Sequence, residues 1–207
     1  MAAINKALEW ITRLAYLNML CIGFTIVGAV IFGLFPSVVA TFAVTRKWVL
    51  GETDVPVFKT FWKSYKSEFV KSNILGFILS LVGYVLYLDF VFVNAIGNNL
   101  GLILTIPFLI ISIIYILTMF YVFPVYVHYD MKLTQVVKNS FFIMFMNPLT
   151  TIIMLFGFSG ITYMLWNFQG LMIFFSISVL ATVIMMSAYR AFDKVNKKQK
   201  LLLQNSN

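Results

Sequence analysis

Residues 102–123 read LILTIPFLIISIIYILTMFYVF and contain no charged side chain. At 1.5 Å per residue, a helix over this stretch is about 33 Å long, which matches the hydrocarbon core of a bilayer. Lipid offers the backbone no hydrogen-bond partners, so an apolar run of this length is stable there as a helix. The stretch therefore predicts a membrane-spanning helix.

Similar apolar runs lie on both sides of this stretch. We predict further spans at residues 14–35, 73–96, 149–166 and 171–189, and a short sixth segment at residues 37–50. Only 11% of the side chains are charged and 61% are hydrophobic, whereas a soluble domain has about 25% charged residues. The sequence thus predicts an all-α, polytopic transmembrane bundle of five or six membrane helices, which forms a single domain over residues 1–207.

The charges of the connecting segments give the orientation. Residues 94–101 and 167–170 are uncharged, whereas residues 46–71, residues 130–138 and the tail after Arg190 contain lysine or arginine. Basic connections stay on the cytoplasmic side of a membrane. We therefore expect a multi-pass protein of the bacterial cytoplasmic membrane with a cytoplasmic C-terminus.

The first apolar runs leave two topologies open. Lys6 and Arg13 favour a cytoplasmic N-terminus, and residues 37–50 then return as a sixth helix after a turn at Phe35-Pro36-Ser37. If residues 37–50 only enter the interface, the bundle has five helices and the N-terminus lies outside. We favour six helices, because both basic side chains then remain in the cytoplasm.

Two further segments, residues 56–72 and 131–146, are amphipathic. In each, apolar side chains recur at helical spacing and polar or basic ones lie between them. We expect both to be interfacial helices at the cytoplasmic side, with the apolar face in lipid and the lysines among lipid phosphates. The candidate residues for contact with lipid or a partner are Phe58, Lys59, Phe61, Trp62, Lys63, Tyr65 and Lys66.

Two ionisable residues near the membrane are candidates for function. Asp89 is the one carboxylate within a predicted span, and such groups are functional candidates by default. Its distance from residue 72 places it near the outer interface, where an ordinary hydrated Asp is the simpler interpretation. His128 closes the inner end of the span at residues 102–123. It is a candidate pH sensor, with a structural role at the interface as the alternative.

The remaining chemistry is sparse. His128 and Cys21 are the single histidine and cysteine and lie far apart in the chain, so they do not form a metal-binding pattern. The sequence contains no nucleotide-binding signature and no clustered catalytic groups. Its basic residues alternate with apolar runs, which does not indicate nucleic-acid binding. We predict no enzyme activity, no cofactor and no metal.

Five sequence strings carry a resemblance to a known family. They are residues 10–18 (WITRLAYLN), 33–37 (GLFPS), 45–48 (TRKW), 54–65 (DVPVFKTFWKSY) and 147–148 (NP). In this order they resemble the YesL-like family of Firmicute membrane proteins, a domain-of-unknown-function family. Ser37 stands where an alanine is expected, which is a change between small residues. The resemblance covers nearly the whole chain and supplies no catalytic residues.

The resemblance implies which proteins the chain works with, but it implies no mechanism. Family members are often encoded beside subunits of ABC-type carbohydrate importers. We therefore expect a non-catalytic accessory or scaffolding subunit that associates with such an importer. Two alternatives remain: a small autonomous channel or carrier that uses Asp89, and a membrane sensor or regulator whose tail, Lys194–Lys200, contacts anionic lipid or a partner.

Overall fold

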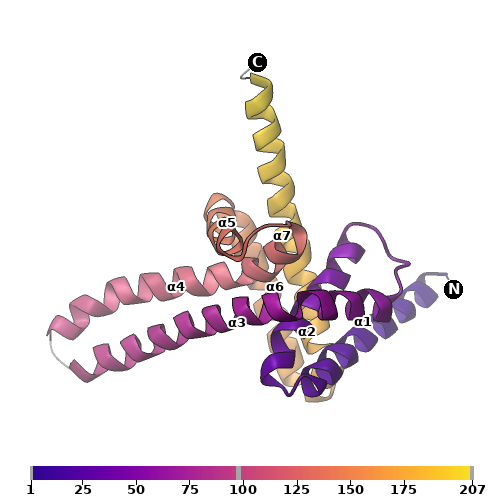
Figure 1. Cartoon of the computed structure of the whole chain (residues 1–207), viewed down its shortest axis with the longest axis horizontal. Helices are drawn as coiled ribbons and strands as arrows, with labels where there is room; N and C mark the ends of the chain where they lie inside the picture. The colour runs from indigo at the N-terminus through magenta and orange to yellow at the C-terminus, as the bar shows by residue number, and fades with distance from the viewer. Residues whose placement is uncertain (1, 97–98, 206–207) are drawn as a thin grey trace.

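A computed structural model describes residues 2–96 and 99–205 of the chain. These residues form seven helices and no strand, which confirms the all-α prediction (Figure 1). The helices are α1 (Ala2–Val27), α2 (Ile31–Val49), α3 (Val57–Ile96), α4 (Asn99–His128), α5 (Leu133–Met146), α6 (Pro148–Asn167) and α7 (Gln169–Asn205).

Five of the described helices are long and apolar enough to cross a membrane. Their candidate spans are Ile4–Val27, Val57–Val93, Ile103–His128, Pro148–Asn167 and Gln169–Lys197. The chain is therefore a multi-pass membrane protein by the length and composition of its helices. Many large apolar side chains on these helices are exposed, as lipid-facing side chains must be.

Helix α2 is more buried than these five, except in its first turn, where Ile31 and Phe32 are exposed. It packs against α1, α3, α4 and α7, and about half of its residues are buried. The Trp10 and Trp48 rings lie 5.4 Å apart, and Arg13 lies 3.5 Å from Asp54. The start of α1 and the end of α2 are thus at the same end of the molecule. The expected sixth segment at residues 37–50 begins earlier, at Ile31, and returns beside α1 as the six-helix topology requires; that it crosses the membrane stays a prediction.

The turn between α1 and α2 lies earlier than the sequence suggested. It occupies residues 28–30, whereas Phe35-Pro36-Ser37 lies within α2. Val30 has φ 61° and ψ −64°, and the Ile31 N–H donates to the Ala29 carbonyl at 2.7 Å. This geometry is a γ-turn with positive φ, which is rare and strained. Close packing at Gly28 accompanies the strained turn: a Cβ on Gly28 would lie 2.7 Å from the backbone nitrogen of Gly33.

Pro36 is tolerated inside α2 because α3 supplies a hydrogen-bond donor. Proline has no N–H, so the carbonyl of Phe32, four residues earlier, loses its usual helical partner. The Asn73 side-chain amide donates to this carbonyl at 2.9 Å and also to the Phe69 carbonyl at 2.8 Å. Asn73 therefore joins α2 to α3 at the position where the sequence pattern had indicated a chain turn.

Helix α3 is continuous over 40 residues, about 60 Å, which is roughly twice the hydrocarbon thickness. The predicted interfacial helix at residues 56–72 and the span at residues 73–96 are thus one helix, and this boundary is corrected. No proline or glycine interrupts α3 before Gly76, so nothing in the local sequence ends it. The second amphipathic segment, residues 131–146, is a separate helix, α5, as predicted.

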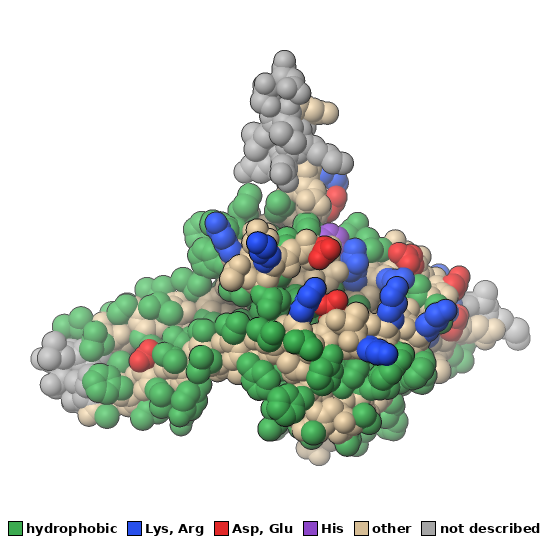
Figure 2. Space-filling view, in the orientation of Figure 1, with side chains coloured by type: hydrophobic (Ala, Val, Ile, Leu, Met, Phe, Trp, Pro, Cys, Tyr) green, Lys and Arg blue, Asp and Glu red, His purple; other side chains and the backbone are tan. Residues whose placement is uncertain are grey.

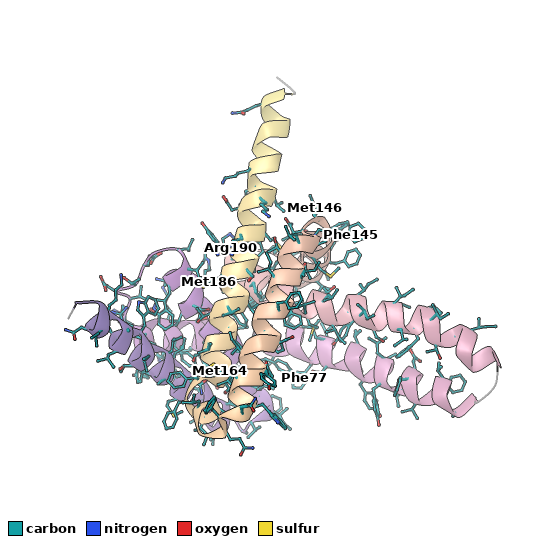
Figure 3. All side chains as sticks on the ribbon, turned by 180° about the vertical axis from the view of Figure 1, so that it is seen from behind. Phe77, Phe145, Met146, Met164, Met186 and Arg190 are labelled. Carbon is teal, nitrogen blue, oxygen red and sulfur yellow. The ribbon has the colours of Figure 1, made fainter. Side chains whose placement is uncertain are left out.

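Besides the hairpin of α1 and α2, the helices form two antiparallel pairs that point in different directions. Helices α3 and α4 extend together away from the rest of the molecule, whereas α7 runs upright and packs against α6, α1 and α2 (Figure 1). On the far side, the exposed Met186 lies in the apolar part of α7, and Arg190 begins its charged part (Figure 3). This change along α7 indicates the level of the membrane surface.

A buried asparagine fastens α1 to α7. The Asn18 side chain is fully buried and donates to the Ile173 carbonyl at 2.6 Å. Its oxygen accepts from the backbone N–H groups of Ile177 and Ser178 at 2.9 and 3.2 Å. Because lipid supplies no replacement partners, these bonds fix the position of α7 relative to the hairpin of α1 and α2.

Candidate functional site

A large basic cavity lies where α2 ends, α3 begins and α4 ends. Its volume is about 840 Å³, which is within the range of small-molecule sites. Figure 2 shows Lys and Arg side chains gathered on this face, close to the single His. The lining residues are Val39, Ala43, Arg46, Lys47, Val55, Pro56, Lys59, Thr60, Lys63, Ser64, Ser67, Glu68, Lys71, Tyr126, Val127, His128, Tyr129, Asp130 and Met131.

Helix α3 provides one wall of this basic cavity. Lys59, Lys63, Ser67 and Lys71 all line it, and their spacing of four residues places them on one face of the helix. Helix α2 adds Arg46 and Lys47, whereas the cavity has only two carboxylates, Glu68 and Asp130. The wall formed by α3 and α2 therefore has a strong excess of positive charge.

One of the two carboxylates is already engaged. The Tyr126 hydroxyl donates to Glu68 at 2.5 Å, which ties α4 to α3 at the cavity wall. Tyr129 also lines the cavity. Burial raises the pKa of its phenol, and a hydrogen bond with Asn196 partly offsets this effect. Tyr129 is therefore a neutral hydrogen-bonding group at physiological pH.

Two nitrogen atoms of the lining residues have no hydrogen-bond partner. They are Nε of Arg46 and Nδ1 of His128, and both atoms are buried. The His128 ring packs between aromatic neighbours, with ring centroids 4.6 Å from Tyr129 and 4.7 Å from Phe192. Buried polar groups usually have partners, so these two nitrogens are exceptions in the packing beside the cavity.

The aromatic face of α3 lies opposite the cavity. Phe61 and Tyr65 are buried against α1 and α2, with ring centroids 5.4 and 5.1 Å from the Phe24 ring. The expectation that these two residues contact lipid or a partner is corrected, because the inner hairpin covers them. Phe58 and Trp62 remain 49% and 43% exposed, so contact with lipid or a partner stays a prediction for them.

The structure brings together only some of the predicted polar residues. Lys59, Lys63 and His128 share the cavity, whereas Lys66 is exposed and lies outside its lining. Asp89 is exposed on the extended part of α3 and lines neither of the two cavities described.

The sequence interpretation missed the contribution of Arg46, Lys71, Glu68 and Tyr126 to the cavity. The four-residue spacing of lysines in residues 59–71 was the available signal. Among the described residues, no group of three or more His, Cys, Asp or Glu side chains could hold a metal ion.

The arrangement defines the class of protein: a multi-pass α-helical membrane protein with a basic cavity at one end of its bundle. Comparison with known proteins then gives the family. Residues 14–90 match the family model described as "Protein of unknown function, DUF624", and together with the relatives below this shows that the chain belongs to the DUF624, or YesL-like, family.

Three Bacillus subtilis proteins are similar over most of the chain. Uncharacterized protein YteU is 38% identical over 189 residues, which cover 91% of this chain and 85% of the relative. Uncharacterized protein YesL is 36% identical over 196 residues (95% and 92%), and uncharacterized protein YesV is 36% identical over 192 residues (93% and 92%). No solved structure matches the chain.

Proposed function

We propose that the chain is a non-catalytic accessory subunit of a membrane complex, and that this complex is an ABC-type carbohydrate importer. The observation that carries the proposal is the exposed aromatic pair at the start of α3, Phe58 and Trp62, whose side chains are 49% and 43% exposed. The sequence lacks a nucleotide-binding signature, so ATP-driven transport requires another chain. The family resemblance supplies the kind of partner, because members are often encoded beside importer subunits.

The contact surface for the partner is the exposed part of the aromatic face of α3. Phe58 and Trp62 pack around Phe24, with ring centroids 6.4 and 5.3 Å from it, and keep an open side. Lys66 follows Trp62 by one helical turn and is exposed. Aromatic side chains with one packed and one open side are typical anchors of protein interfaces.

The experiment is affinity purification of the tagged chain from its own cells in a gentle detergent, followed by quantitative mass spectrometry. We expect importer permeases at near-equal amount with the wild type and at least a fivefold loss with Trp62→Ala. Phe156→Ala is the matched control, because Phe156 is an aromatic residue on α6 that is 76% exposed. The proposal fails if wild-type preparations never contain importer subunits.

A role as membrane sensor is the second candidate. The cavity is assembled from α2, α3 and α4, so an occupant would bias how these three helices pack. The basic tail of α7 includes Lys194 and Lys197. Its contacts with anionic lipid or a partner would then change with the packing of these helices. An autonomous channel that uses Asp89 receives no comparable support, because Asp89 lies outside both described cavities.

A further inference from the structure

We propose that the basic cavity binds a phosphate ester that carries hydroxyl groups. Two sources offer this chemistry: the headgroup of an anionic lipid such as phosphatidylglycerol, and a soluble ester such as glycerol phosphate. The inference concerns the ligand of the cavity and stands apart from the proposed partner, so either can fail without the other.

Most of the cations around the cavity lack counterions in the part of the chain that the structure describes. Among the described residues, the salt bridges do not include Arg46, Lys59, Lys63 or Lys71, whereas Lys47 is paired with Glu52 at 3.5 Å. Several unpaired cations around one cavity repel one another, and an anion between them relieves that repulsion. The four cations come from two helices, α2 and α3, so positive charge lines the cavity from both.

Arg46 brings a guanidinium group to the cavity. Its side chain lines the cavity, and no salt bridge among the described residues includes it. A guanidinium group matches the geometry of phosphate oxygens and forms charge-assisted hydrogen bonds with them. Phosphate is therefore favoured over an uncharged polar ligand, which would leave the positive charge uncompensated.

The groups around the charges are also polar. The cavity is far larger than an inorganic phosphate ion, and its lining includes the hydroxyls of Thr60 and Ser64 and the carboxylate of Asp130, besides Glu68, which already accepts from Tyr126. Hydroxyls both donate and accept, and carboxylates accept from ligand hydroxyls. These groups suit a hydroxylated ester, with its phosphate at the lysines and its hydroxyls toward the carboxylates.

The cavity lies at one end of α3. Helix α3 is too long to lie within the hydrocarbon, and Lys59 and Lys63 belong to its first two turns. When the apolar part of α3 is in lipid, these lysines stand at the level of the headgroups. A lipid headgroup can therefore reach the cavity from the membrane, and a soluble ester can reach it from the cytoplasm.

The test is a calorimetric titration of the purified full-length protein in a neutral detergent with two probes. One probe is glycerol phosphate, and the other is short-chain phosphatidylglycerol below its micelle concentration. We expect saturable binding of at least one probe and at least a tenfold loss of affinity in Lys59→Gln/Lys63→Gln. Lys66→Gln is the matched control, because Lys66 lies on α3 outside the cavity lining, and we expect less than a twofold change.

Each outcome decides the proposal. Binding of glycerol phosphate identifies a soluble ester as sufficient, and binding of the lipid probe alone identifies the headgroup in its membrane setting. Binding of neither probe overturns the proposal. So does a loss of affinity in Lys66→Gln equal to that in the double variant, because the effect would then be general surface charge. Both replaced lysines are exposed, and circular dichroism verifies that the variants keep their helix content.

Discussion

Gly28→Ala is expected to destabilise the protein by about 3 kcal/mol or more, because overpacking against backbone leaves no side chain to move aside. A Cβ on Gly28 would lie 2.7 Å from the Gly33 nitrogen and 2.7 Å from the Tyr65 hydroxyl oxygen. Gly33→Ala has the reciprocal problem, with the Phe24 carbonyl oxygen 2.8 Å from the added carbon. Either change forces α1 and α2 apart at their turn, where Val30 is already strained.

Gly23→Ala is the control, since nothing lies within 4 Å of a Cβ at that helical position. Alanine favours helix over glycine by up to about 1 kcal/mol, so this variant should be as stable as the wild type or slightly more. Thermal unfolding of the three variants in one detergent, followed by circular dichroism, measures the difference. Equal unfolding midpoints for Gly28→Ala and Gly23→Ala would show that α1 and α2 do not pack as closely at Gly28 as the structure indicates.

Asn73→Leu is expected to cost about 2 kcal/mol, because a buried carbonyl left without a donor costs about 1–3 kcal/mol. The carbonyl is that of Phe32, which Pro36 cannot satisfy and which Asn73 contacts at 2.9 Å. The Asn73 side chain is buried, so a leucine in its place leaves no room for water to replace the amide. The effect should therefore depend on the proline.

A double-mutant cycle with Pro36→Ala tests this dependence. The substitution restores an N–H that can bond the Phe32 carbonyl within α2. Asn73→Leu should then cost less than half as much in the Pro36→Ala background, with a coupling of about 1 kcal/mol. Additive changes in the unfolding free energy would mean that Asn73 and Pro36 do not act on the same carbonyl.

Pro36 and Asn73 also show which features of the fold could be predicted from the sequence and which could not. Long apolar runs predicted the all-α membrane fold, because they record the solvent preference of each segment. Pro36 was interpreted as a turn, since proline usually interrupts a helix. Asn73, the donor that replaces the missing N–H of Pro36, is far away in the sequence. The residues around Pro36 give no sign of that contact.

The same limit applies to the candidate site. The helical spacing of Lys59 and Lys63 correctly predicted a basic face on α3, but not what lies opposite it. Arg46 and His128 complete the cavity from α2 and α4, and their convergence depends on tertiary packing. Phe61 and Tyr65 have the same amphipathic signature as lipid-facing residues, although α1 and α2 cover them.

The basic cavity is expected to open to the cytoplasm, on the side where the importer contact is proposed and where a soluble ester is available. Cysteine accessibility tests this orientation directly, because Cys21, the one cysteine of the chain, is buried and leaves the introduced cysteine as the accessible one. A membrane-impermeant maleimide is applied to cells that carry Lys63→Cys or Phe168→Cys. Phe168 lies between α6 and α7 and is 59% exposed.

We predict that Phe168→Cys is labelled in intact cells and that Lys63→Cys is labelled only after the membrane is opened. Labelling of Lys63→Cys in intact cells, with Phe168→Cys protected, would place the cavity outside the cell and contradict the account.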